Sequence, residues 1–307
     1  MGLPQTRFMD PVLALAGFGV GIVVGLTGMG GGALMTPILV LLFGVPPVAA
    51  VSSDLAASAV MKPFGGWVHL RRGTVRWPLV GWLCVGSVPS AFLGVLLLRL
   101  AAPGPVVQHM IQRALAAALL LAAAGLVAKA YTARRRGTGP AAEIRVRPLP
   151  TALLGAAGGL VVGLTSVGSG SLIIVVLLAL YPALRANDLV GTDLVQAIPL
   201  VAAAALGHAL FGDLHLDIAA AVLVGSIPGV LVGARLSSRA PAGFVRSALV
   251  VVLLASALKL LGLGNVSVAA AASAATVLAV AVSLYGRRVA VRRGVRRTPE
   301  PVAAPPS

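Results

Sequence analysis

Two aspartates stand in otherwise apolar sequence, Asp54 and Asp193, and each is followed by a leucine. A carboxylate within a membrane segment is costly to bury, so it marks a functional site by default. Both aspartates could bind and release protons and are candidate proton-coupling residues. Each also lies a few residues past a turn-like sequence, where a carboxylate can cap the start of a helix. The sequence leaves these two interpretations open.

Two glycine-rich stretches, 24–34 and 162–172, have the composition of an anion site. Each glycine costs roughly 1 kcal/mol against alanine in a helix, so we expect the helices to break there. Free N–H groups at a break, together with the positive end of the helix that follows, favour an anion. The predicted substrate-binding residues are Thr27, Gly28, Gly30, Gly31, Gly32, Ser53, Thr165, Ser166, Gly168, Ser169, Gly170 and Thr192.

Close packing is the alternative explanation for glycine in a membrane helix. We prefer it for two ridges in which glycine recurs at every fourth position, because small residues let neighbouring helices approach. These ridges are Gly17, Gly21 and Gly25 in the first half and Gly155, Gly159 and Gly163 in the second. For 28–32 and 166–171 we prefer a binding site, since tandem glycines exceed what packing needs.

Two histidines, His69 and His208, are candidates for gating or proton relay, although an interfacial histidine without such a role is the simpler interpretation of each. An intramembrane serine hydrolase using Ser169 and His208 is the alternative function, but no Gly-x-Ser-x-Gly motif surrounds that serine. We therefore predict a protein that is not an enzyme and has no catalytic residues. The single cysteine, Cys84, excludes a Cys-based metal cluster, and neither a metal nor a cofactor is expected.

The candidate residues recur because the chain repeats itself. An offset of 138 residues relates the second glycine-rich stretch to the first. After one inserted residue the offset becomes 139, which relates Asp193 to Asp54 and His208 to His69. A single insertion over the whole match makes chance similarity very improbable, so we infer an internal duplication.

Composition indicates a polytopic membrane protein. The 307 residues are 58% hydrophobic and 10% charged, with a mean hydropathy of +1.00, whereas soluble proteins carry about 25% charged residues. The net charge of +16 comes from arginines between apolar blocks and in the tail, which is typical of cytoplasmic loops. The expected partners are therefore the lipid bilayer and a small anionic substrate, and no nucleic acid; the oligomeric state is left open.

Charge also predicts orientation. The loop 71–76 contains three arginines and no acid, whereas its equivalent 212–217 contains two acids and no arginine. Equivalent loops of opposite charge character should lie on opposite sides of the membrane, as in an inverted-topology repeat. We expect a multi-pass protein of the cell (inner or plasma) membrane, with the N-terminus outside and the C-terminus in the cytoplasm.

The predicted fold is an all-α polytopic membrane protein with two inverted-topology repeats of about five helical segments each and one extra C-terminal transmembrane helix. The segments 33–43 and 172–181, which follow the glycine clusters, are too short to cross a membrane. The predicted divisions are a polar lead 1–10, a first membrane repeat 11–131, a basic cytoplasmic linker 132–150, a second membrane repeat 151–262, the extra helix 266–286 and a basic, proline-rich cytoplasmic tail 287–307.

The paired motifs resemble the sulfite exporter TauE/SafE family, also called the toluene sulfonate uptake permease family. The resemblance covers residues 10–262 and is carried by 25–32 with Pro37, 52–55, His69 with Gly73, and the second copies 163–170 and 191–194. It implies an integral inner-membrane permease, expected to be an exporter, for sulfur-containing or related organic anions such as sulfite, sulfoacetate or sulfonates. We therefore predict a secondary transporter, proton-coupled or gradient-driven, whose anion lies between 28–32 and 166–170 near both aspartates.

Overall fold

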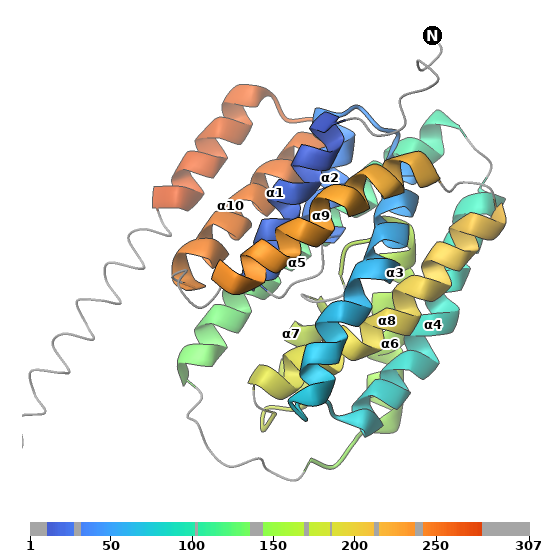
Figure 1. Ribbon diagram of the computed structural model, residues 1–307, viewed down its shortest axis with the longest axis vertical. Coiled ribbons are helices and arrows are strands. Elements are labelled where there is room, and N and C mark those ends of the chain that lie inside the picture. The colour runs from blue at the N-terminus through green and yellow to red at the C-terminus, as the bar shows by residue number, and fades with distance from the viewer. Residues whose placement is uncertain are drawn as a thin grey trace, which may run out of the picture.

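The computed structural model describes residues 11–27, 32–101, 104–135, 144–168, 172–184, 186–211, 215–236 and 242–277. These residues form helices and contain no strand, which confirms the all-α prediction (Figure 1). The helices are α1 (Pro11–Thr27), α2 (Gly32–Leu42), α3 (Pro47–Arg71), α4 (Trp77–Leu100), α5 (Pro105–Arg135), α6 (Pro148–Thr165), α7 (Leu172–Leu180), α8 (Ala186–Phe211), α9 (Leu216–Leu236) and α10 (Ala242–Leu260), followed by a short apolar helix, Asn265–Val277. The polar lead and the tail predicted from 287 onward lie outside the described residues.

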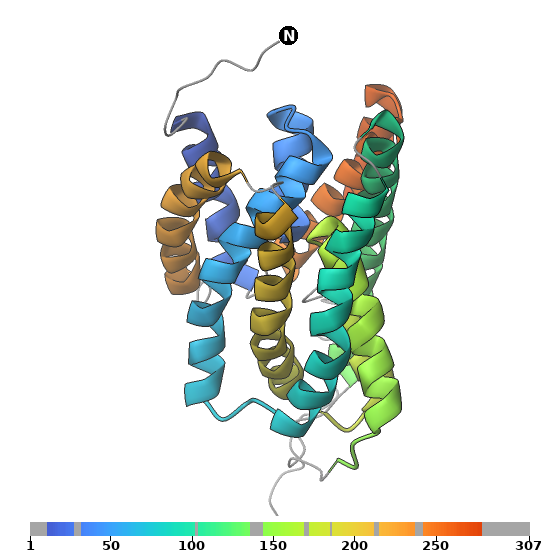
Figure 2. The same ribbon diagram turned by 90° about the vertical axis from the view of Figure 1, so that its right-hand side faces the viewer.

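Among the described helices, α4, α5, α6, α8 and α9 are long and apolar enough to cross a membrane. In the side view the long helices run roughly up and down the bundle, next to one another (Figure 2). This arrangement supports the prediction of a multi-pass membrane protein. The inverted orientation of the two halves in a bilayer stays a prediction.

The second glycine-rich stretch interrupts the helix where the sequence predicts, since 166–168 are not helical; in the first stretch, 28–31 lie outside the described residues. In the first half α1 ends at Thr27 and α2 begins at Gly32, and in the second half α6 ends at Thr165 and α7 begins at Leu172. The two helices that follow the breaks have 11 and 9 residues, and a spanning helix needs about 20. Each half thus contains a helix that is too short to span a bilayer by itself.

Helices of one half pack mainly on helices of the other. The first helix α1 lies along α9, and α4 lies along α6 (Figure 1). A Cβ added to Gly21 would lie 2.5 Å from the Ser226 carbonyl oxygen, and one added to Gly159 would overlap the Ser87 carbonyl oxygen. The sequence offsets relate Gly159 to Gly21 and Ser226 to Ser87. The ridge glycines therefore permit the same close approach at two equivalent interfaces.

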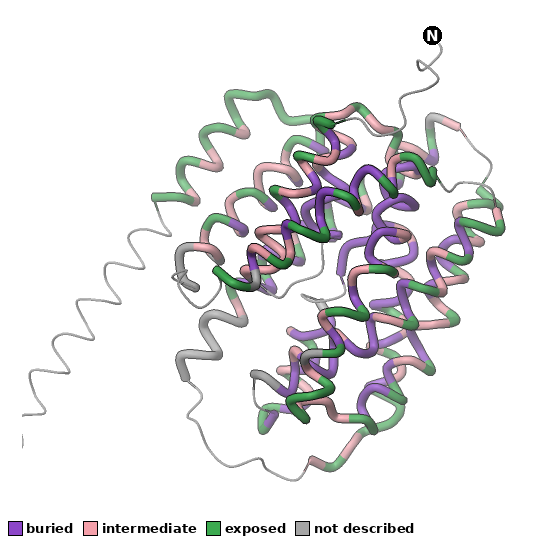
Figure 3. The backbone as a smooth tube through the Cα atoms, viewed as in Figure 1, coloured by how far each residue is buried: buried purple, intermediate pink, exposed green. Residues whose placement is uncertain are grey.

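Two apolar clusters form the core. The first gathers side chains from α1, α2, α9, α10 and the middle of α5, and the second gathers them from α4, α6, α7, α8 and the start of α5. Helix α3 contributes to both, with Ala50 and Ala57 in the first cluster and Val51 and Leu55 in the second. Buried residues follow the inner sides of these helices (Figure 3). Helix α3, which also packs on α8, is thus a central element of the bundle.

The packing role of the ridge glycines can be tested with two substitutions in α1. Gly21→Ala should lower the free energy of unfolding by about 1–3 kcal/mol, because its methyl group meets the backbone of α9. Gly19→Ala is the matched control, since a Cβ there meets nothing within 4 Å and alanine favours the helix. Thermal unfolding in detergent measures both variants. Equal melting temperatures would contradict the close contact.

Candidate functional site

The carboxylate of Asp54 is the centre of the buried polar groups. Asp54 lies on α3 and is 2% exposed. Its Oδ2 accepts a hydrogen bond from Thr36 Oγ1 at 2.9 Å and another from Ser166 Oγ at 2.5 Å. Thr36 belongs to α2, the short helix after the first break, and Ser166 belongs to the second break. Because buried polar groups need partners, one carboxylate oxygen joins both broken segments.

The described ends of the two glycine clusters are in direct contact. Gly32 is the first residue of α2, and a Cβ added to it would overlap the Ser166 carbonyl oxygen. The same Cβ would lie 3.1 Å from Asp54 Oδ2. Only glycine therefore fits where the two breaks meet the carboxylate.

Several predicted site residues lie outside the described part of the chain. These are Gly28, Gly30 and Gly31 in the first cluster and Ser169 and Gly170 in the second. Thr27 is the last residue of α1. Binding of substrate by these residues stays a prediction.

Ser166 holds an unusual backbone conformation. It caps α6 with a left-handed φ of 58°, and its N–H donates to the Val162 carbonyl oxygen at 2.7 Å. Among the described residues other than glycine it has the only positive φ. This conformation is unfavourable for residues with a Cβ, and the equivalent position in the first half is Gly28. A serine at this place contributes the hydroxyl that reaches Asp54, which points to a function.

Two more predicted residues shape the backbone of the second break. The Thr165 hydroxyl donates to the Val161 carbonyl oxygen at 2.6 Å and accepts from the Val167 N–H at 3.2 Å. Gly168 has a φ of 131°, a conformation open to glycine. Both residues have a structural role here, and their contact with a substrate stays a prediction.

Asp193 has different surroundings from Asp54. It lies on α8, is 2% exposed, and its Oδ1 accepts from Gln196 Nε2 at 3.4 Å. Gln196 is fully buried, and its Oε1 accepts from Ser87 Oγ on α4 at 3.3 Å. Sequence reasoning missed Gln196, because its equivalent in the first half is Ala57. The only indication of a role for Gln196 in the sequence was its polar amide within an apolar segment.

Lys62 connects the two aspartates electrostatically. It lies on α3 two turns after Asp54, is 7% exposed, and interacts with the charges of both Asp193 and Asp54. The equivalent position in the second half is Val201, so one ammonium group serves both carboxylates. When all three groups are ionised, this cluster has one excess negative charge.

The hydroxyls of Ser53 and Thr192 contact loops of the opposite half. Ser53 Oγ donates to the His215 carbonyl oxygen at 3.3 Å, and Thr192 Oγ1 accepts from the Arg76 N–H at 3.0 Å. The two contacts are equivalent, because the sequence offset of 139 relates Ser53 to Thr192 and Arg76 to His215. These residues therefore connect α3 and α8 to the loops, and their contact with a substrate stays a prediction.

The two predicted relay histidines lie in the last turns of α3 and α8. His69 Nδ1 is 2.9 Å from Thr74 Oγ1 in the following loop. His208 is fully buried. Because Ser169 is outside the described residues, its pairing with His208 in a hydrolase is not tested.

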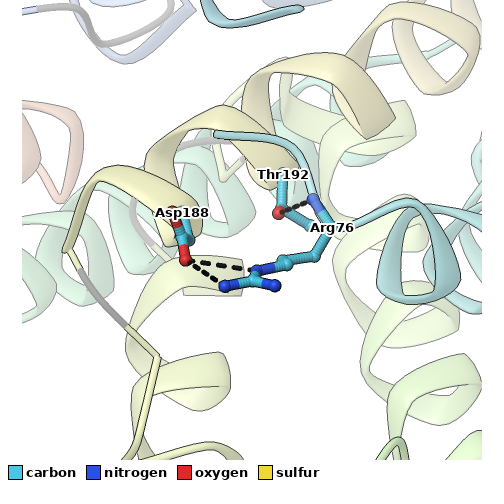
Figure 4. Close-up of polar contacts among 3 residues, drawn as sticks. All are labelled: Arg76, Asp188 and Thr192. Atoms are coloured by element: carbon cyan, nitrogen blue, oxygen red, sulfur yellow. Dashed lines mark hydrogen bonds and ion pairs between the residues drawn. The ribbon is translucent and has the colours of Figure 1, made fainter. Parts of the chain in front are cut away.

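An ion pair fixes the loop after α3 to the start of α8 (Figure 4). Asp188 Oδ2 accepts from Arg76 Nη2 at 2.8 Å and from Arg76 Nε at 3.2 Å. The Asp188 side chain is 3% exposed and that of Arg76 is 37% exposed. Asp188 lies in the first turn of its helix, where the helix dipole favours a carboxylate. The sequence suggested only an orientation signal in Arg76 and gave no role to Asp188, whose equivalent is Ala49.

Comparison with known proteins places this chain among membrane transporters. The model of the Sulfite exporter TauE/SafE family matches residues 13–260. The chain is 38% identical over 256 residues to the Probable membrane transporter protein YjnA of Bacillus subtilis (strain 168), covering 82% of this chain and 100% of that protein. It is 26% identical over 258 residues to the Probable membrane transporter protein YdhB of the same organism, covering 81% and 99%. No solved structure matches the chain.

The bonds to Asp54 can be tested by a double-mutant cycle. Thr36→Val should lower the free energy of unfolding by about 1–3 kcal/mol, because it removes a donor to a buried carboxylate. In an Asp54→Asn background the same substitution should cost less, since the amide carries no charge. Chemical or thermal unfolding in detergent measures the four proteins. Additive effects would contradict a direct bond between the two side chains.

A second cycle tests the ion pair. Arg76→Gln should lower the free energy of unfolding by about 1–3 kcal/mol, because it leaves the buried Asp188 carboxylate without its guanidinium partner. Adding Asp188→Asn should restore part of the loss, since no uncompensated charge then remains. The double variant is compared with Arg76→Gln by thermal unfolding. A double variant less stable than the single one would contradict this account.

Proposed function

The chain belongs to the sulfite exporter TauE/SafE family, and from this membership we propose that it is a secondary transporter of small sulfur-containing or organic anions, such as sulfite or sulfonates. Family membership and the apolar helices make it a multi-pass membrane protein. We propose further that the transported molecule is an anion, that it moves outward and that its transport is coupled to protons. The family name supports export, and the site chemistry supports an anion.

The contact of Gly32 with Ser166 beside Asp54 is the observation that carries the proposal. Interrupted backbone within a membrane is tolerated where protein or a water-filled cavity covers it, and transporters with inverted repeats bind substrate at such breaks. Gly32 begins α2, so the first N–H groups of this helix and its positive dipole end lie beside the second break. An anion is the ligand that such a helix start stabilises.

The buried carboxylates support coupling to protons. An anion bound about 5 Å from an ionised Asp54 would be repelled by about 3 kcal/mol at an effective dielectric constant near 20. Protonation of an aspartate removes this repulsion, so Asp54 and Asp193 are the proposed proton-coupling residues. The charge of Lys62, which interacts with both, further reduces the electrostatic cost of holding an anion nearby.

The contacts between the halves support the proposed inverted topology. The first helix of each half, α1 or α6, packs on α9 or α4 of the other half, and the residues in contact are related by the sequence offsets. Two halves related by a two-fold axis in the membrane plane produce such reciprocal contacts. With the charge bias of the loops, this supports an N-terminus outside and a C-terminus in the cytoplasm.

Transport by the purified protein in proteoliposomes tests the proposal. We expect uptake of at least one labelled anion from a panel of sulfite, sulfoacetate, methanesulfonate and acetate. Gly32→Ala should lower the initial rate on the order of tenfold or more, because overpacking of about 1–3 kcal/mol falls on the contact between the breaks. Gly104→Ala is the control, since a Cβ there meets nothing within 4 Å. The proposal fails if the wild type moves no anion of the panel above empty liposomes.

A further inference from the structure

We propose that a cavity beside the start of α6 binds the phosphate headgroup of an anionic membrane lipid, with Arg145 and Arg147 as its cationic partners. The cavity has a volume of about 450 Å³ and lies where the segment before α6 meets the end of α7. Its lining consists of residues 144–147 and 180–183. This inference is independent of the proposed anion transport, because it concerns residues other than those at the breaks.

Buried and exposed residues alternate in the segment that leads into α6. Ile144 and Val146 are half-buried and pack against the second apolar cluster, whereas Arg145 and Arg147 are exposed. Arg147 has an extended backbone, with φ of −104° and ψ of 95°, and successive side chains of an extended segment point to opposite sides. The two arginines therefore share one side, about 7 Å apart along the chain. At this spacing both guanidinium groups can reach one phosphate, whose oxygens they match in pairs.

A hydrogen-bonded tyrosine holds the wall of the cavity in place. Tyr181 is buried, and its hydroxyl accepts from the Arg147 N–H at 2.9 Å. The same oxygen lies 2.6 Å from Thr151 Oγ1, which donates to the Arg147 carbonyl oxygen at 2.7 Å. Because the backbone of Arg147 is already fixed on both sides, a ligand need not order it. The duplication does not account for these hydroxyls, since the equivalent residues are Leu13 and Phe43.

The start of α6 adds a positive potential but few hydrogen-bond donors. Pro148 and Pro150 stand in its first turn, and proline has no backbone N–H. The N–H of Thr151 is already bonded to the Arg147 carbonyl oxygen. The helix dipole therefore favours an anion here, whereas the hydrogen bonds to it must come mainly from side chains. This assigns recognition of the phosphate to the two arginines.

The surroundings of the cavity favour an amphiphile over a free anion. The end of α7 provides an apolar wall, with Leu180 and Pro182. On α6, Leu149 and Leu153 lie one turn apart and are strongly exposed. Because α6 is long and apolar enough to cross a membrane, these leucines can contact acyl chains. A lipid with its phosphate at the arginines therefore has apolar surface beside it for its chains.

The cavity lies at the same end of the bundle as the arginine-rich loop 71–76. The end of α3 and the start of α6 share this end in both views (Figure 1 and Figure 2). Under the proposed orientation this end faces the cytoplasm, where the membrane surface is negative and basic pockets between helices bind lipid headgroups. The positive-inside bias explains the sign of the charge there. The cavity and the Tyr181 contacts determine where one headgroup is bound.

Thermal unfolding of the full-length protein in detergent, with and without added lipid, tests the inference. The probes are dioctanoyl phosphatidylglycerol, which has a net negative charge, and dioctanoyl phosphatidylcholine, whose phosphate is offset by an ammonium group. Phosphatidylglycerol should raise the melting temperature saturably, since a ligand stabilises the state that binds it, and phosphatidylcholine should have little effect. Arg145→Gln and Arg147→Gln should each weaken the response to phosphatidylglycerol on the order of tenfold in concentration. The double variant should no longer distinguish the two lipids.

Arg99→Gln is the matched control, because it removes another exposed arginine, in the last turn of α4 at the opposite end of the bundle. It should respond as the wild type does. Tyr181→Phe should weaken the response to phosphatidylglycerol but keep the preference over phosphatidylcholine, because both arginines remain. An equal response to the two lipids, or a wild-type response of the double variant, would overturn the proposed site. Glycerol 3-phosphate that stabilises the protein at the same concentrations would overturn the assignment to a lipid. None of these outcomes depends on transport, so failure here is distinct from failure of the proposed function.

Discussion

A carboxylate in an apolar interior must be hydrogen-bonded or neutralised, and the centre of this protein is arranged around that constraint. Asp54 has its donors on α2 and at the end of α6, segments from opposite halves of the chain. Their approach leaves no room for a side chain at Gly32 and is accompanied by a left-handed Ser166. The carboxylate, the absent Cβ and the strained serine are therefore parts of one arrangement.

The surrounding helices determine that the two breaks meet. Helix α1 is packed against α9 and α6 against α4, with glycines at the contacts that bring the backbones together. Because each pairing joins one half to the other, the halves cannot separate without losing both interfaces. These helix pairs thus hold the breaks, while α3 brings Asp54 to the second break.

Features that the duplication repeats were predictable from sequence, whereas several residues that it does not repeat were missed. The short helices after the breaks follow from glycine content, and Asp54 was singled out as a charge in an apolar segment. The bonding partners Thr36 and Gln196 have Ile174 and Ala57 at their equivalent positions, so comparison of the halves gave them no weight. Asp188 was missed for the same reason, since packing alone brings it to Arg76.

Residues that differ between the two halves give Asp54 and Asp193 different surroundings. Two identical halves would have two equally surrounded carboxylates, and like charges in a poorly screened interior repel strongly. Lys62 interacts with both aspartates, and its counterpart in the second half is Val201. The chain also has a serine hydroxyl at one break where the other has Gly28. The duplicated frame supplies two aspartates, and these unpaired substitutions give Asp54 a hydroxyl donor from the second break and Asp193 an amide donor from its own helix.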